Sequence, residues 1–201
     1  MTDLTAAAAD REWTLDELAD AYAYPETGGP WLRANMVSTL DGAAQHDGRS
    51  QGISNATDMR IFGTLRAGRC GGGGGGDRTA GGLPARPRPR GLRGPAYGGR
   101  AGPAPAIAVV SASLDLDFSL PLFVSPLVRT LVVTGAGAPS DRIHAAREAG
   151  ADVVVAGDGA AVEPARAVAE LAARGLNRLL TEGGPRLLGQ FVAAGCWTSS
   201  A

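Results

Sequence analysis

The chain has 201 residues, which is enough for one domain with a substantial hydrophobic core. Its formal net charge of −1 argues against a general nucleic-acid binder, and no apolar run reaches the roughly 18 residues of a membrane span. The two cysteines and two histidines are too few for a disulfide framework and lack the spacing of a zinc site.

The N-terminal segment "MTDLTAAAADREW" lacks the basic start and apolar core of a secretory signal, so we expect a soluble cytoplasmic protein. "TLDELADAYAYP" has helical spacing and ends before Pro25. "LRANMVSTLDG" predicts a strand up to Leu40 that runs into an Asp-Gly turn. "SNATDMRIFGTLRA" predicts a helix that Ser54 or Asn55 can cap.

Residues 69–104 read "RCGGGGGGDRTAGGLPARPRPRGLRGPAYGGRAGPA" and interrupt this pattern where another strand is expected. Their high Gly and Pro content and few apolar residues predict a disordered segment inside the domain. A structureless stretch of this length is uncommon in a compact domain.

The second half of the chain alternates strand and helix patterns. The β-branched runs "AIAVVSASLDL", "TLVVTGAG" and "ADVVVAGD" predict buried strands, and "RLLTEGG" predicts a fourth. "SDRIHAAREAG", with Ser140 at the N-cap, "EPARAVAELAARG" and "PRLLGQFVAAG" predict helices that each end before a glycine. This alternation predicts a mainly parallel sheet covered on both faces.

Three segments together, "ANMVSTLDGAAQHDGRSQGIS", "DMRIFGTLRA" and "RLLTEGGPRLLGQF", resemble the reductase domain of bacterial riboflavin biosynthesis, a domain often fused to a deaminase. The resemblance covers residues from about 31 to 68 and from about 105 to 195. It implies a single α/β domain over residues 1–201, with a dihydrofolate-reductase-like three-layer fold. It also implies NADPH-dependent reduction of a phosphoribosylamino-uracil, with hydride passing to C1 of the ring-opened ribosyl group. No zinc-deaminase signature is present in the sequence.

In this family, the helix that matches "DMRIFGTLRA" is followed by a buried strand, a "GxGT" turn and a loop. The sequence as written lacks all three, so we expect the fold to be incomplete here. If the codons of Gly68 to Leu83 are read in a frame that starts one nucleotide later, their degeneracy permits the sequence "ADVVVVGAGTVRREGY", which supplies the strand, the turn and the loop. Read one nucleotide earlier, Cys196 to Ala201 permits "LLDELC", which suits the family's continuation. We interpret both stretches as frameshifted text, with the family frame resuming between residues 84 and 105. The alternative is a genuine disordered insertion and a natural terminus.

The resemblance also assigns candidate site residues. It places substrate contacts at Ser50, Arg66 and Glu182. It places cofactor contacts at Val37, Thr39, Asp41, Ser111, Gly183, Gly184, Pro185, Arg186, Leu187 and Gly189. Independent chemistry supports two of these groups, because an arginine fork suits a phosphoryl group and a strand-to-helix turn offers free backbone N–H groups. No residue is identified as a proton donor.

Each assignment has a structural alternative. Arg66 suits a helix C-terminus, Glu182 could be a solvated loop carboxylate, and Asp41 is a common turn residue. The Gly183–Gly184 pair could be only a tight turn, and both histidines are most simply surface residues.

The functional alternatives are a pterin reductase on the same fold and an inactive cofactor-binding relic. An RNA-binding protein that uses the Gly/Arg stretch is a third, which the net charge opposes. The expected partner is a small phosphorylated pyrimidine, with neither nucleic acid nor membrane, and a homodimer is left open.

Overall fold

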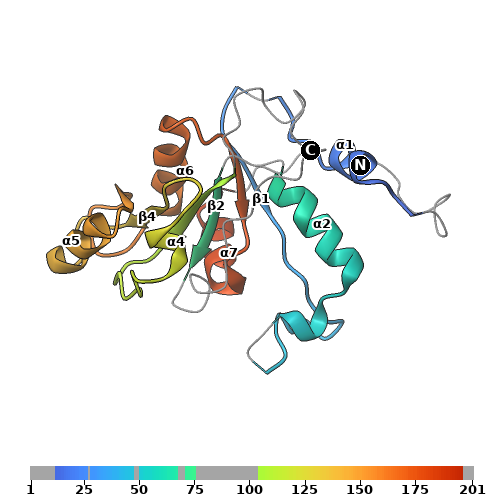
Figure 1. Cartoon of the computed structure of the whole chain (residues 1–201), viewed down its shortest axis with the longest axis horizontal. Coiled ribbons are helices and arrows are strands. Elements are labelled where there is room, and N and C mark those ends of the chain that lie inside the picture. Colours follow the sequence, from blue (N-terminus) through green and yellow to red (C-terminus); the bar gives the residue numbers. More distant parts are fainter. Residues whose placement is uncertain (1–11, 27, 48–49, 68–70, 76–103, 197–201) are drawn as a thin grey trace.

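The structure, a computed structural model, describes residues 12–26, 28–47, 50–67, 71–75 and 104–196. Six strands in these ranges form one parallel sheet in the order β1-β6-β2-β3-β4-β5 (Figure 1). The strands are β1 (Trp31–Ala34), β2 (Gly71–Gly75), β3 (Ala106–Val110), β4 (Leu131–Thr134), β5 (Asp152–Val155) and β6 (Arg178–Thr181). The predicted α/β class with a parallel sheet is therefore confirmed. Parallel strands bring all their C-terminal ends to one side of the sheet, which we call the carboxyl edge.

Helices cover both faces of the sheet, and further helices lie beside one of its edges. They are α1 (Leu15–Ala21), α2 (Ala56–Ala67), α4 (Pro121–Val124), α5 (Ser140–Glu148), α6 (Pro164–Ala173), α7 (Gly184–Ala193) and a short 3-10 helix, η1 (Gln51–Ile53). In Figure 1, α1 and α2 lie together beside the β1 side of the sheet. No helix in the described ranges combines the length and apolar character that a membrane crossing requires.

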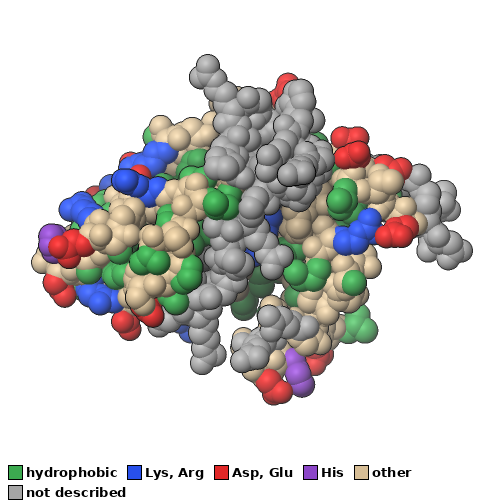
Figure 2. Space-filling model, viewed as in Figure 1, with side chains coloured by type: hydrophobic (Ala, Val, Ile, Leu, Met, Phe, Trp, Pro, Cys, Tyr) green, Lys and Arg blue, Asp and Glu red, His purple; other side chains and the backbone are tan. Residues whose placement is uncertain are grey.

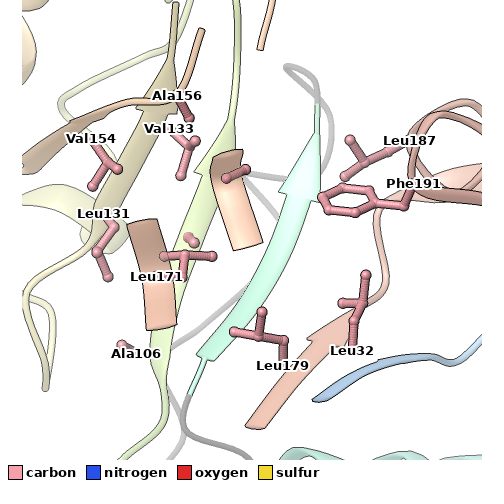
Figure 3. Packing of buried hydrophobic residues seen from close by; sticks show 12 residues of the cluster. Leu32, Ala106, Leu131, Val133, Val154, Ala156, Leu171, Leu179, Leu187 and Phe191 are labelled. Atoms are coloured by element: carbon pink, nitrogen blue, oxygen red, sulfur yellow. The ribbon is translucent and has the colours of Figure 1, made fainter. Parts of the chain in front are cut away.

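Two clusters of buried side chains lie on opposite faces of the sheet. The first includes Leu131 and Val133 of β4 together with residues of α6 and α7 (Figure 3). The second includes Val132 of β4 together with residues of α4 and α5. Because successive side chains of a strand point to opposite faces, β4 is buried on both, as its β-branched run predicts.

The helix ends follow the sequence signals closely. Thr14 and Glu17 form a reciprocal capping box at α1. Of the two candidate caps of α2, Asn55 accepts the backbone N–H of Asp58 at 2.9 Å. At α5 the cap position belongs to Pro139, so the prediction of Ser140 as N-cap is wrong by one residue.

Two strands are shorter than predicted. β1 ends at Ala34 rather than Leu40, because Thr39 closes a turn in which its N–H donates to the Ala43 carbonyl at 2.9 Å. β3 ends at Val110, because the Ser111 hydroxyl accepts the backbone N–H of Leu114 at 3.1 Å. In both places a local side-chain or turn hydrogen bond competes with the sheet.

The glycine run contributes a strand to the centre of the sheet. Gly71–Gly75 form β2, which pairs in parallel with β6 on one side and β3 on the other. The prediction that residues 69–104 lack regular structure is therefore wrong for these five residues. Residues 76–103 lie outside the described part, so the prediction stays untested there.

Candidate functional site at the carboxyl edge

The centre of the candidate site is an ion pair between α2 and the end of β6. Arg66 Nε donates to the two carboxylate oxygens of Glu182 at 2.9 and 3.1 Å, and Nη2 donates to Oε2 at 2.7 Å. The Glu182 side chain is only 7% exposed and that of Arg66 23%. Glu182 is therefore not a solvated loop carboxylate, and two of the three predicted substrate residues meet.

Phe62 contacts the face of the same guanidinium. It lies one helical turn before Arg66 on α2, and Arg66 Cζ sits 3.9 Å from the centroid of its ring. Residues four apart on a helix share a face, so this contact follows from the spacing. Sequence reasoning assigned Phe62 no part in the site.

The N-terminus of α7 lies beside this pair, directly after Glu182. Gly183 is buried and occupies the cap position, and Gly184 adopts a left-handed φ of +55°. The first turn of a helix leaves backbone N–H groups without intrahelical partners, and among the described residues no side chain at the cap position binds them. The Gly184 N–H donates to the Glu182 carbonyl at 3.0 Å and Pro185 has no N–H, so the candidate donors to a ligand are the N–H groups of Gly183 and Arg186. This arrangement suits a dinucleotide pyrophosphate.

A buried polar side chain at the end of β6 supports a ligand site at this place. Thr181, the last residue of β6, is 3% exposed, and its hydroxyl oxygen has no hydrogen-bond partner among the described residues. A buried hydroxyl without a partner costs free energy unless water or a ligand completes it. The residues at the end of β6 therefore fit a polar group bound there.

The remaining predicted residues of α7 divide by burial. Leu187 is 7% exposed and packs into the core with Phe191 (Figure 3), so only its backbone is available to a ligand. Pro185, Arg186 and Gly189 are exposed.

The loop after β1 carries Val37, Thr39 and Asp41. Thr39 donates its hydroxyl to the Asp41 carboxylate, and this hydroxyl also accepts the Ala43 N–H at 3.0 Å. The hydrogen bond from Thr39, followed by that from the Ala43 backbone, lowers the pKa of Asp41 below its ordinary value. Asp41 and Gly42 thus form the predicted turn, with Gly42 at a φ of +84°.

Ser111 stands at the carboxyl edge, at the end of β3. Its hydroxyl oxygen accepts the backbone N–H of Leu114, a fully buried residue with a φ of +54°. Arg142 of α5 donates to the carbonyls of Leu114 and Leu116 at 3.0 and 3.1 Å, which fixes this loop. A serine hydroxyl that accepts one bond still has its own O–H to donate to a ligand.

Sequence reasoning missed a glycine contact between the loops that follow β4 and β5. A Cβ at Gly135 would collide with the Gly159 carbonyl, and one at Gly157 would collide with the Ala161 carbonyl. Ala136 N–H donates to the Gly157 carbonyl at 2.8 Å. A glycine within two residues of the end of each of two neighbouring strands, in "VVTGAG" and "VVVAGD", is the signal that could have revealed this approach.

Other candidates stay apart from the ion pair. Ser50 is exposed at the start of η1, and within the described ranges no hydrogen bond joins it to Arg66 or Glu182. His46 and His144 are surface residues with side chains 74% and 73% exposed (Figure 2). In the described part of the chain, no cluster of side chains is suited to a metal ion.

Comparisons with known proteins agree on one family. A family model described as the RibD C-terminal domain matches residues 30–198. A pyrimidine reductase-like protein from Corynebacterium diphtheriae is similar over 84% of this chain and 71% of its own, with 25% identity and a TM-score of 0.70. No curated protein matches significantly.

A second solved structure supports the fold. It is a diaminohydroxyphosphoribosylaminopyrimidine deaminase/5-amino-6-(5-phosphoribosylamino)uracil reductase from Thermotoga maritima, similar over 82% of this chain with 16% identity and a TM-score of 0.55. This chain spans 42% of that longer protein. The predicted dihydrofolate-reductase-like fold is confirmed by this likeness.

Proposed function

Because the chain belongs to the RibD C-terminal domain family, we propose that it is a pyrimidine reductase of riboflavin biosynthesis that uses NADPH. The proposed substrate is 5-amino-6-(5-phosphoribosylamino)uracil, the compound named for the reductase of Thermotoga maritima. A cytoplasmic location is part of the proposal. The observation that carries it within the structure is the Arg66–Glu182 pair, buried at the carboxyl edge beside the first turn of α7.

The turn from β6 into α7 supports the cofactor assignment. NADPH, when bound, supplies the hydride. The N–H groups of Gly183 and Arg186 at the start of α7 would hold its pyrophosphate, since a helix N-terminus offers both donors and a favourable dipole. The absence of a side chain at Gly183 and Gly184 lets a ligand approach the backbone there.

The substrate assignment depends on Arg66. Its guanidinium is held by Glu182 through Nε and Nη2, and Nη1 has no hydrogen-bond partner within the described ranges. A planar guanidinium offers paired donors to phosphate oxygens. Arg66 would therefore bind the phosphoryl group of the substrate from the carboxyl edge.

The contribution of the protein to the reaction is positioning. When two ligands are held together at one edge of a rigid sheet, the reaction between them becomes effectively unimolecular. Glu182 orients Arg66, and the α7 turn lies next to Glu182 in the chain, so the two proposed ligand sites are adjacent.

The test is a nicotinamide absorbance assay with a purified chain in which "ADVVVVGAGTVRREGY" replaces residues 68–83. We expect oxidation of NADPH with the phosphoribosylamino-uracil, slower oxidation of NADH, and none with a dihydropterin. Arg66→Lys in the same chain should raise the substrate KM and leave the NADPH KM nearly unchanged. Turnover of the pterin in place of the pyrimidine would identify the alternative reductase, and an equal rise in both KM values would refute the role of Arg66.

A further inference from the structure

We propose that Phe62 is a positioning residue that, together with Glu182, clamps the guanidinium of Arg66 from two directions. Glu182 binds one edge of the guanidinium through three hydrogen bonds of 2.9, 3.1 and 2.7 Å. Phe62 covers one face, with Arg66 Cζ 3.9 Å from its ring centroid. An edge and a face together fix both the direction and the tilt of the planar group.

The clamp leaves one part of the guanidinium for a ligand. Nε and Nη2 are committed to the carboxylate, so Nη1 and the second N–H of Nη2 remain. The Arg66 side chain is 23% exposed, so part of it is accessible to a ligand. The same two contacts that restrain Arg66 therefore also select which of its donors can meet an anion.

The physical consequence is pre-organisation. A free arginine side chain samples many rotamers, and a ligand must pay for ordering it on binding. Glu182 also cancels the formal charge of Arg66, so an anion is held by the direction of the remaining N–H groups and not by net positive charge. Loss of the ring would let the guanidinium tilt about its bonds to Glu182 and misdirect those donors.

The chemical class of ligand is a phosphate monoester, and this part rests on the proposed function. The clamp itself is a property of the ligand-free chain. The two can therefore be tested separately, one by a signal of Arg66 and the other by titration with an anion.

The first measurement is the Nε–Hε signal of Arg66 in a proton–nitrogen NMR spectrum, assigned by its loss in Arg66→Lys. A proton held above an aromatic ring is shielded, so Phe62→Leu should move this signal downfield and speed its exchange with water. Phe62→Tyr keeps the ring and should leave the signal nearly in place. Met59→Leu, an exposed position on the same helix, is the matched control. An Arg66 signal unchanged in Phe62→Leu would overturn the clamp.

The second measurement is titration of the same signal with inorganic phosphate. Phe62→Leu should weaken phosphate binding by about threefold to tenfold, the range of a partly desolvated cation–π contact, and Phe62→Tyr should restore it. A merely structural role would lower the melting temperature of Phe62→Leu without moving this midpoint, which would refute the positioning role. If phosphate fails to shift the wild-type Arg66 signal, the phosphate assignment is wrong, whereas the first measurement still decides the clamp.

Discussion

Arg66 and Glu182 form a charged pair in which both side chains are largely withdrawn from water. Their side chains are 23% and 7% exposed, and three hydrogen bonds join them. Burial of two charges has a large desolvation cost, so such a pair adds little net stability. Removal of one partner is different, because the charge that stays behind is still largely buried and has lost these three hydrogen bonds.

Arg66→Ala should therefore destabilise the fold by about 3 kcal/mol, the usual cost of breaking a buried pair. Arg166→Ala is the matched control, since its partner Asp158 is 90% exposed and an exposed pair is worth about 0–1 kcal/mol. Denaturant unfolding of both variants measures the difference. Equal losses would mean that Glu182 is solvated in the absence of Arg66.

The Thr39–Asp41 turn gives a second prediction, in the pH dependence of a single carboxyl group. Hydrogen bonds from Thr39 and then Ala43 lower the pKa of Asp41 below 3.8. A lowered folded-state pKa contributes stability that is present above the unfolded value and lost as the pH falls through the folded value. Thr39→Val should raise the pKa of Asp41 toward its ordinary value and so narrow the pH range over which this stability is lost.

Carboxyl carbon NMR titration measures this shift. Asp117, whose pKa is lowered by Ser119, lies in another loop and should titrate identically in both proteins. If the pKa of Asp41 stays low in Thr39→Val, the Thr39 hydroxyl is not its cause.

Helices and strands with strong local signals could be predicted from the sequence, whereas contacts between distant segments could not. The left-handed glycines Gly150, Gly175 and Gly195 end α5, α6 and α7 as their positions predict. Arg66 and Glu182, by contrast, are 116 residues apart, and they meet only because β6 inserts between β1 and β2. The resemblance placed both near the substrate, but no spacing rule predicts that they bind each other.

Local patterns also failed where two tendencies compete. The apolar residues after Ala34 favour a strand, but the Thr39 turn takes their backbone out of the sheet. Gly71–Gly75 have a poor intrinsic preference for a strand, and pairing with strands on both sides overrides it. The site loops after β4 and β5 depend on backbone contact, which side-chain patterns do not encode.

Those two loops give a prediction about close backbone approach. Gly135→Ala places a methyl group against the Gly159 carbonyl and should destabilise the fold by about 1–3 kcal/mol, as overpacking does. Gly159→Ala is the control, because nothing lies within 4 Å of the place that its methyl group would take. Thermal unfolding of the two variants should separate them clearly. Equal melting temperatures would show that the loops open without cost.

A further prediction concerns the glycines of β2. In the parallel register, Gly72 lies between Leu180 and Ile107, and Gly74 lies beside Val109. Each of these neighbours is buried, so a valine at either position would add apolar burial and lose the entropic penalty of glycine. Gly72→Val and Gly74→Val should each stabilise the fold by about 1–2 kcal/mol in denaturant unfolding. A loss of stability in both would mean that the space is already filled.

The topology makes β2 the link between the two parts of the sheet. β6 and β1 lie on one side of it and β3, β4 and β5 on the other, and in the described sheet β6 and β3 pair with β2 and not with each other. The ion pair and the α7 turn belong to one part, whereas the Ser111 loop belongs to the other. A substrate and a cofactor that contact both parts therefore depend on a strand of five glycines to keep them in register.

This dependence leads to a prediction for activity. Small misplacement of two reactants costs much rate, and a glycine strand supplies no side chain to fix the two parts of the sheet. We expect the 201-residue chain to show no measurable NADPH oxidation with the phosphoribosylamino-uracil. A chain rebuilt with "ADVVVVGAGTVRREGY" in place of residues 68–83 should be more stable and should turn over. The shifted reading puts valines at positions 70–73, so three of them fall within β2.

A side-by-side absorbance assay, with both chains at equal folded concentration, measures the difference. Similar rates would mean that the glycine strand is sufficient, that the Gly-rich stretch is a tolerated insertion, and that the frameshift interpretation is wrong.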